Sequence, residues 1–149
     1  MEDRFEIFTT RVASISRNIR KIKTEEMREF DLKSPHVSCL YYLYKKNGTL
    51  TATQLCDICE EDKAAISRSI DYLEKNDYLY CESKTEKKYN CPIVLTEKGL
   101  KVAKILVDKV DKVLSLASIG LSEEDRAVFY KALILISDNL KSLTNEYKS

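Results

Sequence analysis

The sequence predicts a mainly α fold with one small β-hairpin, and three observations lead to this prediction. Only three glycines and two prolines interrupt the 149 residues, so long helices are expected. Long stretches repeat apolar residues every three or four positions, which is the period of an amphipathic helix. Near residue 80 the pattern changes to β-forming residues on either side of a short polar segment.

Composition limits the class of protein. With 44% hydrophobic and 33% charged residues, the chain suits one compact domain over residues 1–149. A membrane span would need about 18 consecutive apolar residues, which the sequence lacks. Charged Asp3, Arg4 and Glu6 interrupt the segment where an export signal would lie. We therefore expect a cytoplasmic protein with no membrane partner, in which the five cysteines are reduced thiols.

The first two predicted helices differ in length. The first has an apolar stripe at spacings of three and four, formed by Phe5, Phe8, Val12, Ile15, Ile19 and Ile22. Such a stripe is stable only when another surface covers it. The second is expected to begin with Ser34 as N-cap before Pro35 and to end at Asn47 and Gly48.

Two short helices follow, separated by a tight break. Thr51 is expected to cap the first and Asp62 the second, which then ends at Asn76 and Asp77 because these residue types tolerate a left-handed backbone. The second of these helices has a buried stripe at helical spacing, made of Ile66, Ile70 and Leu73. This arrangement is typical of a helix-turn-helix.

A hairpin is predicted next. Residues 78–81 and 91–95 are rich in β-forming side chains and flank a charged tip at residues 82–90. Helix, turn, helix and hairpin, in this order, make a winged helix-turn-helix, which we place at residues 34–99.

The last two predicted helices are capped by Thr96 and by Ser122 and keep an apolar stripe to the end of the chain. The terminal stripes have little core of their own to cover, so they are expected to pack on each other and on a second copy. Residues 1–30 and 100–149 are thus predicted to be dimerisation helices of a homodimer. A monomeric helical bundle is the alternative.

Three segments form a specific combination: GTLTATQLCDIC at 48–59, DKAAISRSIDYLEKNDYL at 62–79 and IVLTEKG at 93–99. Together they resemble the MarR family of bacterial regulators, and the similarity extends over nearly the whole chain. The resemblance implies a dimer with a recognition helix and a wing in each subunit, often regulated by small aromatic ligands. The chain departs from the family at Asp77, where glycine is common, and at Glu86-Lys87-Lys88-Tyr89, where the wing commonly has Asp-x-Arg.

The predicted recognition helix has a polar face opposite its buried stripe, made of Lys63, Ala64, Ser67, Arg68 and Asp71. In the major groove of double-stranded DNA, Arg68 suits guanine or a phosphate, and Lys63 suits a phosphate. Ala64 permits close approach to a thymine methyl group, and Ser67 suits either kind of contact.

Two further groups are candidates for phosphate contacts. The start of the preceding helix offers Thr51, Thr53 and Gln54. The predicted wing offers Lys84, Lys87 and Lys88, which lack the planar fork of arginine. The net charge of +1 does not by itself indicate a nucleic-acid partner.

These predictions favour a sequence-specific transcriptional regulator, a ligand-responsive repressor that binds a pseudo-palindromic operator as a homodimer. We expect no enzymatic activity, no catalytic residues and no cofactor. Two alternatives stay open. The low net charge and the lysine-bearing wing also suit a dimeric winged-helix module that binds another protein, and the cysteines suit a thiol-based redox-responsive regulator.

A ligand pocket and a redox pair are further candidates. The predicted second helix offers His36, Tyr41 and Tyr44 to a small aromatic effector, although tyrosines there equally suit a core. Cys81 and Cys91 are symmetric about Glu86, so a regular hairpin would place them opposite each other as a redox pair.

The other cysteines suggest sites that the sequence supports less well. Cys56 and Cys59 have a metal-ligand spacing, but the single histidine, His36, lies in another helix, so core packing is expected and no metal. A nucleophile and base formed by Cys39 and His36 would lack an oxyanion hole and an orienting acid.

Overall fold

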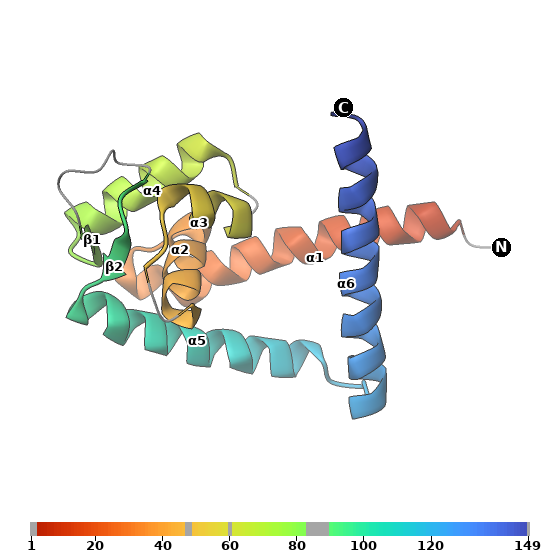
Figure 1. The fold of residues 1–149 in the computed structure, drawn as a ribbon. Coiled ribbons are helices and arrows are strands. Elements are labelled where there is room, and N and C mark those ends of the chain that lie inside the picture. The colour runs from red at the N-terminus through yellow and green to blue at the C-terminus, as the bar shows by residue number, and fades with distance from the viewer. Residues whose placement is uncertain (1–2, 47–48, 60, 83–89, 149) are drawn as a thin grey trace. The chain divides into compact units, whose positions relative to one another are not determined.

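The computed structural model describes residues 3–46, 49–59, 61–82 and 90–148. In these ranges the chain is mainly helical with a two-stranded hairpin, which confirms the predicted fold class (Figure 1). The elements are α1 (Arg4–Glu26), η1 (Arg28–Phe30), α2 (Ser34–Lys45), α3 (Ala52–Cys59), α4 (Lys63–Lys75), β1 (Leu79–Cys81), β2 (Ile93–Leu95), α5 (Glu97–Ala117) and α6 (Glu123–Glu146).

The chain divides into two compact units, Met1–Val110 and Asp111–Ser149. The first contains the helix-turn-helix, the hairpin, α1 and most of α5. The second contains the end of α5 and all of α6. No helix in the described ranges is long and apolar enough to cross a membrane.

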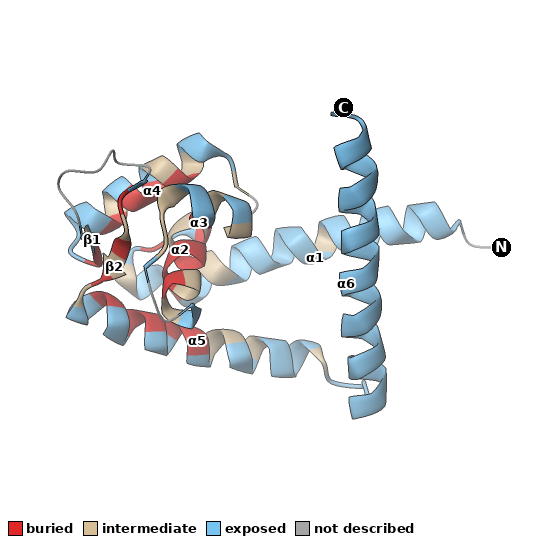
Figure 2. Cartoon of the chain, viewed as in Figure 1, coloured by how far each residue is buried: buried red, intermediate tan, exposed pale blue. Residues whose placement is uncertain are grey.

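The core of the first unit belongs to the helix-turn-helix. Leu40 of α2, Leu55 of α3, and Ile66 and Leu73 of α4 are all fully buried. Figure 2 shows the buried positions concentrated on α2, α4 and the first half of α5. By contrast, α1 has no buried residue, so its apolar stripe is uncovered within the first unit.

Two of the predicted helix caps are present in the helix-turn-helix. At the start of α3 the Thr51 hydroxyl accepts the Gln54 N–H at 3.2 Å, and the Gln54 side-chain oxygen accepts the Thr51 N–H at 2.9 Å. At the start of α4 the Asp62 carboxylate accepts the Ala65 N–H at 2.7 Å. Each cap satisfies a backbone donor that the first turn of the helix leaves free.

The predicted cap of α2 is wrong by one residue. Lys33 is the N-cap, and Ser34 already lies within the helix. The Ser34 N–H donates to the Thr24 hydroxyl of α1 at 3.1 Å, so this donor is satisfied by another helix. The helix ends at Lys45, and the predicted stop at residues 47–48 lies outside the described residues.

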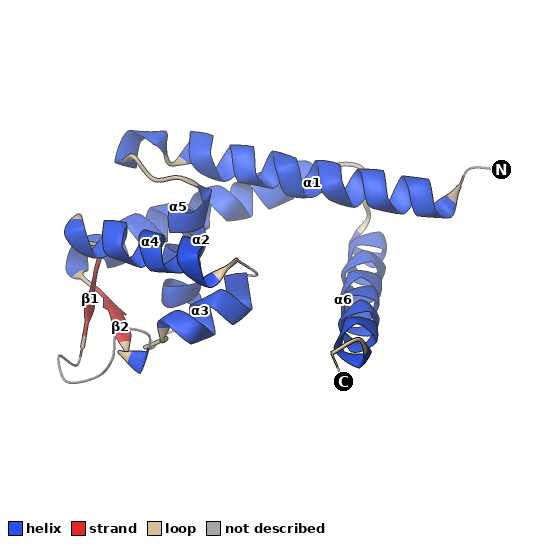
Figure 3. Cartoon of the chain, turned by 90° about the horizontal axis from the view of Figure 1, so that it is seen from above, coloured by secondary structure: helices blue, strands red, loops and turns tan. Residues whose placement is uncertain are grey.

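The hairpin register also differs from the symmetric pairing. In the antiparallel pair, Leu79 faces Leu95 and Cys81 faces Ile93. Both ends of the strand pair are held by further backbone bonds: Thr96 N–H donates to the Tyr78 carbonyl at 3.0 Å, and Ile93 N–H donates to the Leu50 carbonyl at 2.9 Å. Figure 3 shows the two strands side by side at one end of α4.

The junction between α4 and the hairpin is tightly built. Asp77 has a φ of 63°, so the left-handed residue predicted after α4 is present without glycine. Its carbonyl accepts the Thr96 hydroxyl at 2.6 Å, and the Thr96 hydroxyl in turn accepts the Gly99 N–H at 3.0 Å, as predicted for the cap of α5. A Cβ at Gly99 would lie 2.0 Å from the Tyr78 carbonyl oxygen, so only glycine fits there.

The second unit leaves its apolar stripe uncovered. Ser122 caps α6 as predicted, since its hydroxyl accepts the Asp125 N–H at 3.0 Å. No residue of α6 is buried. The exposed apolar side chains include Phe129, Leu133, Ile136, Leu140 and Leu143.

Candidate nucleic-acid interface

The two faces of α4 differ in chemistry. Ile66, Ile70 and Leu73 are buried, as predicted. On the other side, Lys63, Ala64, Arg68 and Asp71 are exposed and Ser67 is half-buried. The helix therefore presents cationic, hydroxyl and small side chains on one accessible face, while its apolar face is fixed on the core. This is the chemistry that base edges and phosphates require.

The start of α3 is a second candidate surface. Thr53 and Gln54 are exposed and Thr51 is half-buried. Thr51 and Gln54 cap the helix through one oxygen each, which leaves the Thr51 hydroxyl proton and the Gln54 side-chain amide as donors for a phosphate. Lys84, Lys87 and Lys88 of the wing lie outside the described residues.

The three candidate pocket residues are not brought together. The His36 ring stacks on Tyr72 with centroids 4.2 Å apart, and Tyr41 makes an edge contact with Tyr42. Tyr44 lines a cavity of about 600 Å³ between the end of α2, β2 and α5. Its other lining residues in the described ranges are Leu43, Lys45, Thr49, Val94, Leu95 and Leu100.

A second hollow was not predicted. It has a volume of about 510 Å³ and is lined by Arg20, Lys21, Thr24, Glu25, Lys33, Ser34 and Pro35, where the end of α1 meets the start of α2. Three of these side chains are cationic and one is acidic. The cluster of basic residues after Arg17 is visible in the sequence, but only the α1–α2 packing shows that it borders a concave surface.

His36 has a structural role at the start of α2. Its Nδ1 accepts the Lys33 backbone N–H at 3.0 Å, so the neutral ring is the form that caps the helix. Burial, followed by the positive charge of Lys33, lowers the pKa of His36, while Asp31 acts in the opposite direction. His36 contacts Lys33 and Tyr72, and Cys39 is fully buried in the core.

This geometry predicts a pH dependence of stability. Because the pKa of His36 is lower in the folded state, the unfolded chain binds the proton more tightly. Above the unfolded pKa of about 6.5, His36 is neutral in both states and does not change the free energy of unfolding. As the pH falls from that value to the lower pKa of the folded state, the free energy of unfolding decreases. The expected result is a smaller free energy of unfolding at pH 5 than at pH 7, measured by urea titration. His36→Gln keeps an acceptor at this position and should flatten that slope, and an equal slope in the variant would contradict the assignment.

The cysteines lie in two places. A disulfide joins Cys81 and Cys91, whose Cα atoms are 5.8 Å apart, although Cys81 is directly opposite Ile93. The expectation of five reduced thiols is therefore wrong for this pair. Cys56 and Cys59 are half-buried and pack against the core, as the sequence predicted. In the described part of the chain, no three His, Cys, Asp or Glu side chains gather in a metal-binding arrangement.

Comparison with known proteins shows what this chain is similar to. Residues 30–87 match the model of the MarR family. A search of curated protein sequences finds no match. Many solved structures share the fold, and several of them are described as MarR-family regulators.

Three of these structures cover nearly the whole chain. A MarR family transcriptional regulator from Listeria monocytogenes, complexed with 26mer DNA, has 24% identity and a TM-score of 0.81 over 94% of this chain and 90% of its own. The transcriptional regulator SlyA has 22% identity and a TM-score of 0.82 over 91% and 94%. A MarR transcriptional regulator from Methanosarcina mazei Go1 has 17% identity and a TM-score of 0.84 over 96% and 94%. Residues 30–87 of this chain thus match the MarR family model, and the chain as a whole shares the fold of these regulators.

Proposed function

We propose that this protein is a transcriptional regulator that binds duplex DNA sequence-specifically, with α4 in the major groove. The observation that carries the proposal is the accessible polar face of α4, with Arg68 and Lys63 exposed opposite a fully buried apolar face. The complex of the Listeria regulator with 26mer DNA supports the same partner. A DNA partner implies a cytoplasmic location.

Fluorescence anisotropy with the DNA upstream of the protein's own gene tests the proposal. A specific regulator should bind this DNA at physiological salt at least about 10³-fold more tightly than a scrambled duplex. Equal micromolar binding to both duplexes would contradict sequence-specific recognition. Binding to neither, with a folded dimer, would favour the protein-interaction module instead.

We infer a homodimer from the two uncovered apolar stripes, each considered within its own unit. Ile15, Ile19 and Ile22 of α1 are at least 37% exposed, and Leu133 and Leu140 of α6 are at least 44% exposed. Soluble monomers rarely leave stripes of this length open to water.

A second copy would cover them and pair two α4 helices, which suits a pseudo-palindromic operator with half-sites about one helical turn apart. We infer that it acts as a repressor, because a dimer on such an operator would exclude other proteins from the same DNA. Sedimentation equilibrium should give twice the 17.2 kDa chain mass, and a monomer at all concentrations would contradict the inference.

A small aromatic effector with a carboxylate would suit the second hollow. Arg20 is already paired with Glu61 at 3.1 Å, so Lys21 and Lys33 are the cations left to meet an anion. Millimolar benzoate should then weaken DNA binding, and Lys33→Met should reduce this effect, while Lys45→Met, which changes the other cavity, should not. An equal response in both variants would contradict the assignment of the site.

Redox response is a second candidate function, because the Cys81–Cys91 disulfide closes the base of the wing. A covalent link there restricts how the wing is presented to the minor groove. Reducing the protein with dithiothreitol should therefore change its affinity for specific DNA by several-fold. The double variant Cys81→Ser/Cys91→Ser should bind as the reduced protein does and should not respond to dithiothreitol. An unchanged affinity in the wild type would limit the disulfide to a structural role.

A further inference from the structure

The end of α1 has two faces with different chemistry. Ile19 and Ile22 belong to the uncovered apolar stripe, on which we infer that a second copy packs. Arg20, Lys23 and Thr24 are spaced by three and four residues, so they share a second face of the same helix. Whatever fixes the apolar face in the dimer therefore also fixes the position of these three polar side chains.

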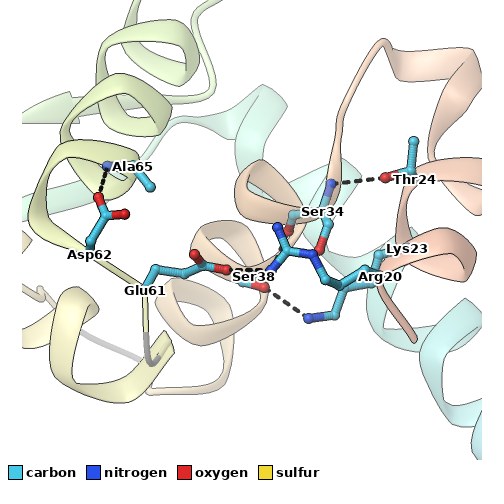
Figure 4. Close-up of polar contacts among 8 residues, drawn as sticks. All are labelled: Arg20, Lys23, Thr24, Ser34, Ser38, Glu61, Asp62 and Ala65. Carbon is cyan, nitrogen blue, oxygen red and sulfur yellow. Dashed lines mark hydrogen bonds and ion pairs between the residues drawn. The ribbon is translucent and has the colours of Figure 1, made fainter. Parts of the chain in front are cut away.

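Two residues of the polar face hold α2. Lys23 Nζ donates to Ser38 Oγ at 2.9 Å, and the Thr24 hydroxyl accepts the Ser34 N–H at 3.1 Å (Figure 4). Both bonds are partly buried, so water competes with them less than it does at the open surface. The helix α2 is thus fixed on the end of α1.

The third residue of this face reaches the start of α4. The Arg20 guanidinium lies 3.1 Å from the Glu61 carboxylate, although the two residues are 41 positions apart in sequence. Glu61 directly precedes Asp62, whose carboxylate caps α4 by accepting the Ala65 N–H at 2.7 Å. Figure 4 shows the ion pair and the cap on these successive residues. A restraint on Glu61 is therefore a restraint on the first turn of α4.

The other end of α4 is held by contacts of a different kind. The Tyr72 hydroxyl donates to the Asp31 carbonyl at 2.6 Å, and the Tyr72 ring stacks on the His36 ring. About 14 Å separate Lys63 from Tyr72 along the helix axis. The side chains proposed to enter the major groove begin with Lys63, so they start at the end of α4 that the Arg20 ion pair holds.

We propose that Arg20 is a positioning residue for DNA recognition: through Glu61 it fixes the first turn of α4 relative to α1, and so sets which spacing of half-sites the dimer accepts. This inference rests on the proposed homodimer and its operator. A second copy packed on α1 would place the two α4 helices relative to each other through α1. One added base pair moves a half-site by about 3.4 Å along the DNA and about 35° around it. A loosened α4 can follow this shift better than a restrained one.

The exposure of the ion pair sets the size of the expected effect. The Arg20 side chain is 55% exposed and that of Glu61 is 20% exposed. Water and salt therefore screen the attraction, and a pair of this kind changes an equilibrium by about 1.4-fold to fivefold. An effect of this size is measurable when the control variant removes the same charge.

Half-site spacing is a readout that a purely structural role would not change. The probes are the upstream duplex and the same duplex with one base pair inserted at the centre of the segment that the protein protects. Anisotropy gives the ratio of the two affinities, in which the general attraction of positive charge to DNA cancels. Arg20→Met should lower this ratio by about twofold to fivefold. Arg17→Met, three residues earlier on α1, removes the same charge and should leave the ratio unchanged.

Charge reversal separates the ion pair from either residue alone. Arg20→Glu and Glu61→Arg should each lower the ratio, because like charges then face each other. The double variant Arg20→Glu/Glu61→Arg should restore it, and Arg20→Lys, which keeps the cation, should retain most of it. An unchanged ratio in Arg20→Met, or a double variant as defective as the two single ones, would overturn the proposal.

Hydrogen exchange on the full chain without DNA tests the restraint by itself. Arg20→Met should speed exchange of the Ala65 and Ile66 amides by about twofold to fivefold and leave the Asn76 amide, at the far end of α4, unchanged. Unchanged exchange in the first turn, or equally faster exchange at both ends, would overturn the positioning role. If the wild type does not distinguish the upstream duplex from a scrambled one, the proposed function fails, whereas the exchange result still decides whether Arg20 restrains α4.

Discussion

Replacing Arg68 with alanine is expected to weaken binding to specific DNA by about 1–3 kcal/mol, or about fivefold to 150-fold. Arg68 is exposed on the accessible face of α4 and has the planar donor fork that matches guanine or a phosphate. Anisotropy titrations against the specific and the scrambled duplex, at one salt concentration, measure the loss. If Arg68 contacts a base, the specific duplex should lose more affinity than the scrambled one.

Arg28→Ala is the matched control for Arg68→Ala. Arg28 is also an exposed arginine of the first unit, but it lies in η1 and pairs with Glu25 at 2.9 Å. Its removal changes the net charge equally and should leave the ratio of specific to scrambled binding unchanged. If the two variants lose equal affinity for specific DNA, Arg68 contributes only a general electrostatic attraction to DNA. No loss at Arg68 would favour the protein-interaction module.

Replacing Gly99 with alanine is expected to destabilise the protein by about 2–3 kcal/mol, because overpacking of this kind disturbs backbone as well as side chains. The added Cβ would lie 2.0 Å from the Tyr78 carbonyl oxygen, which also accepts the Thr96 N–H. Alanine favours a helix by about 1 kcal/mol relative to glycine. The expected destabilisation is the net loss after this gain has been subtracted. Thermal unfolding at a fixed protein concentration should show the melting temperature falling by about 4–12 °C.

Gly120→Ala separates steric overlap from backbone conformation. Gly120 has a φ of 97°, and a Cβ there meets no atom within 4 Å. Only the left-handed conformation opposes the substitution, at about 1–2 kcal/mol. A loss at Gly99 no larger than that at Gly120 would mean that the contact between α5 and the Tyr78 carbonyl relaxes easily.

The helix-turn-helix could be predicted because local signals specify it. Thr51 and Asp62 directly precede the helices that they cap, so both caps can be recognised from the neighbouring residues. Ile66, Ile70 and Leu73 repeat at the helical period. Asp77 takes the left-handed conformation that its residue type tolerates. The matched segment, residues 30–87, is the one in which these local signals are densest.

What could not be predicted depends on contacts between distant segments. Ser34 was expected to be a cap, but Thr24 of α1 accepts its N–H and so extends the helix by one residue. The strand pair is held at its ends by backbone bonds of Leu50 and Thr96, outside the hairpin itself.

The base of the wing has a consequence for how the protein can change in evolution. Both ends of the strand pair are held by Leu50, Tyr78 and Thr96, none of which lies between the two strands in sequence. Insertions or deletions among residues 83–89 would therefore leave the pairing of Leu79 with Leu95 in place. The segment that would meet the minor groove is free to vary in length and charge without refolding its support, so new operator preferences need not be gained at the expense of stability.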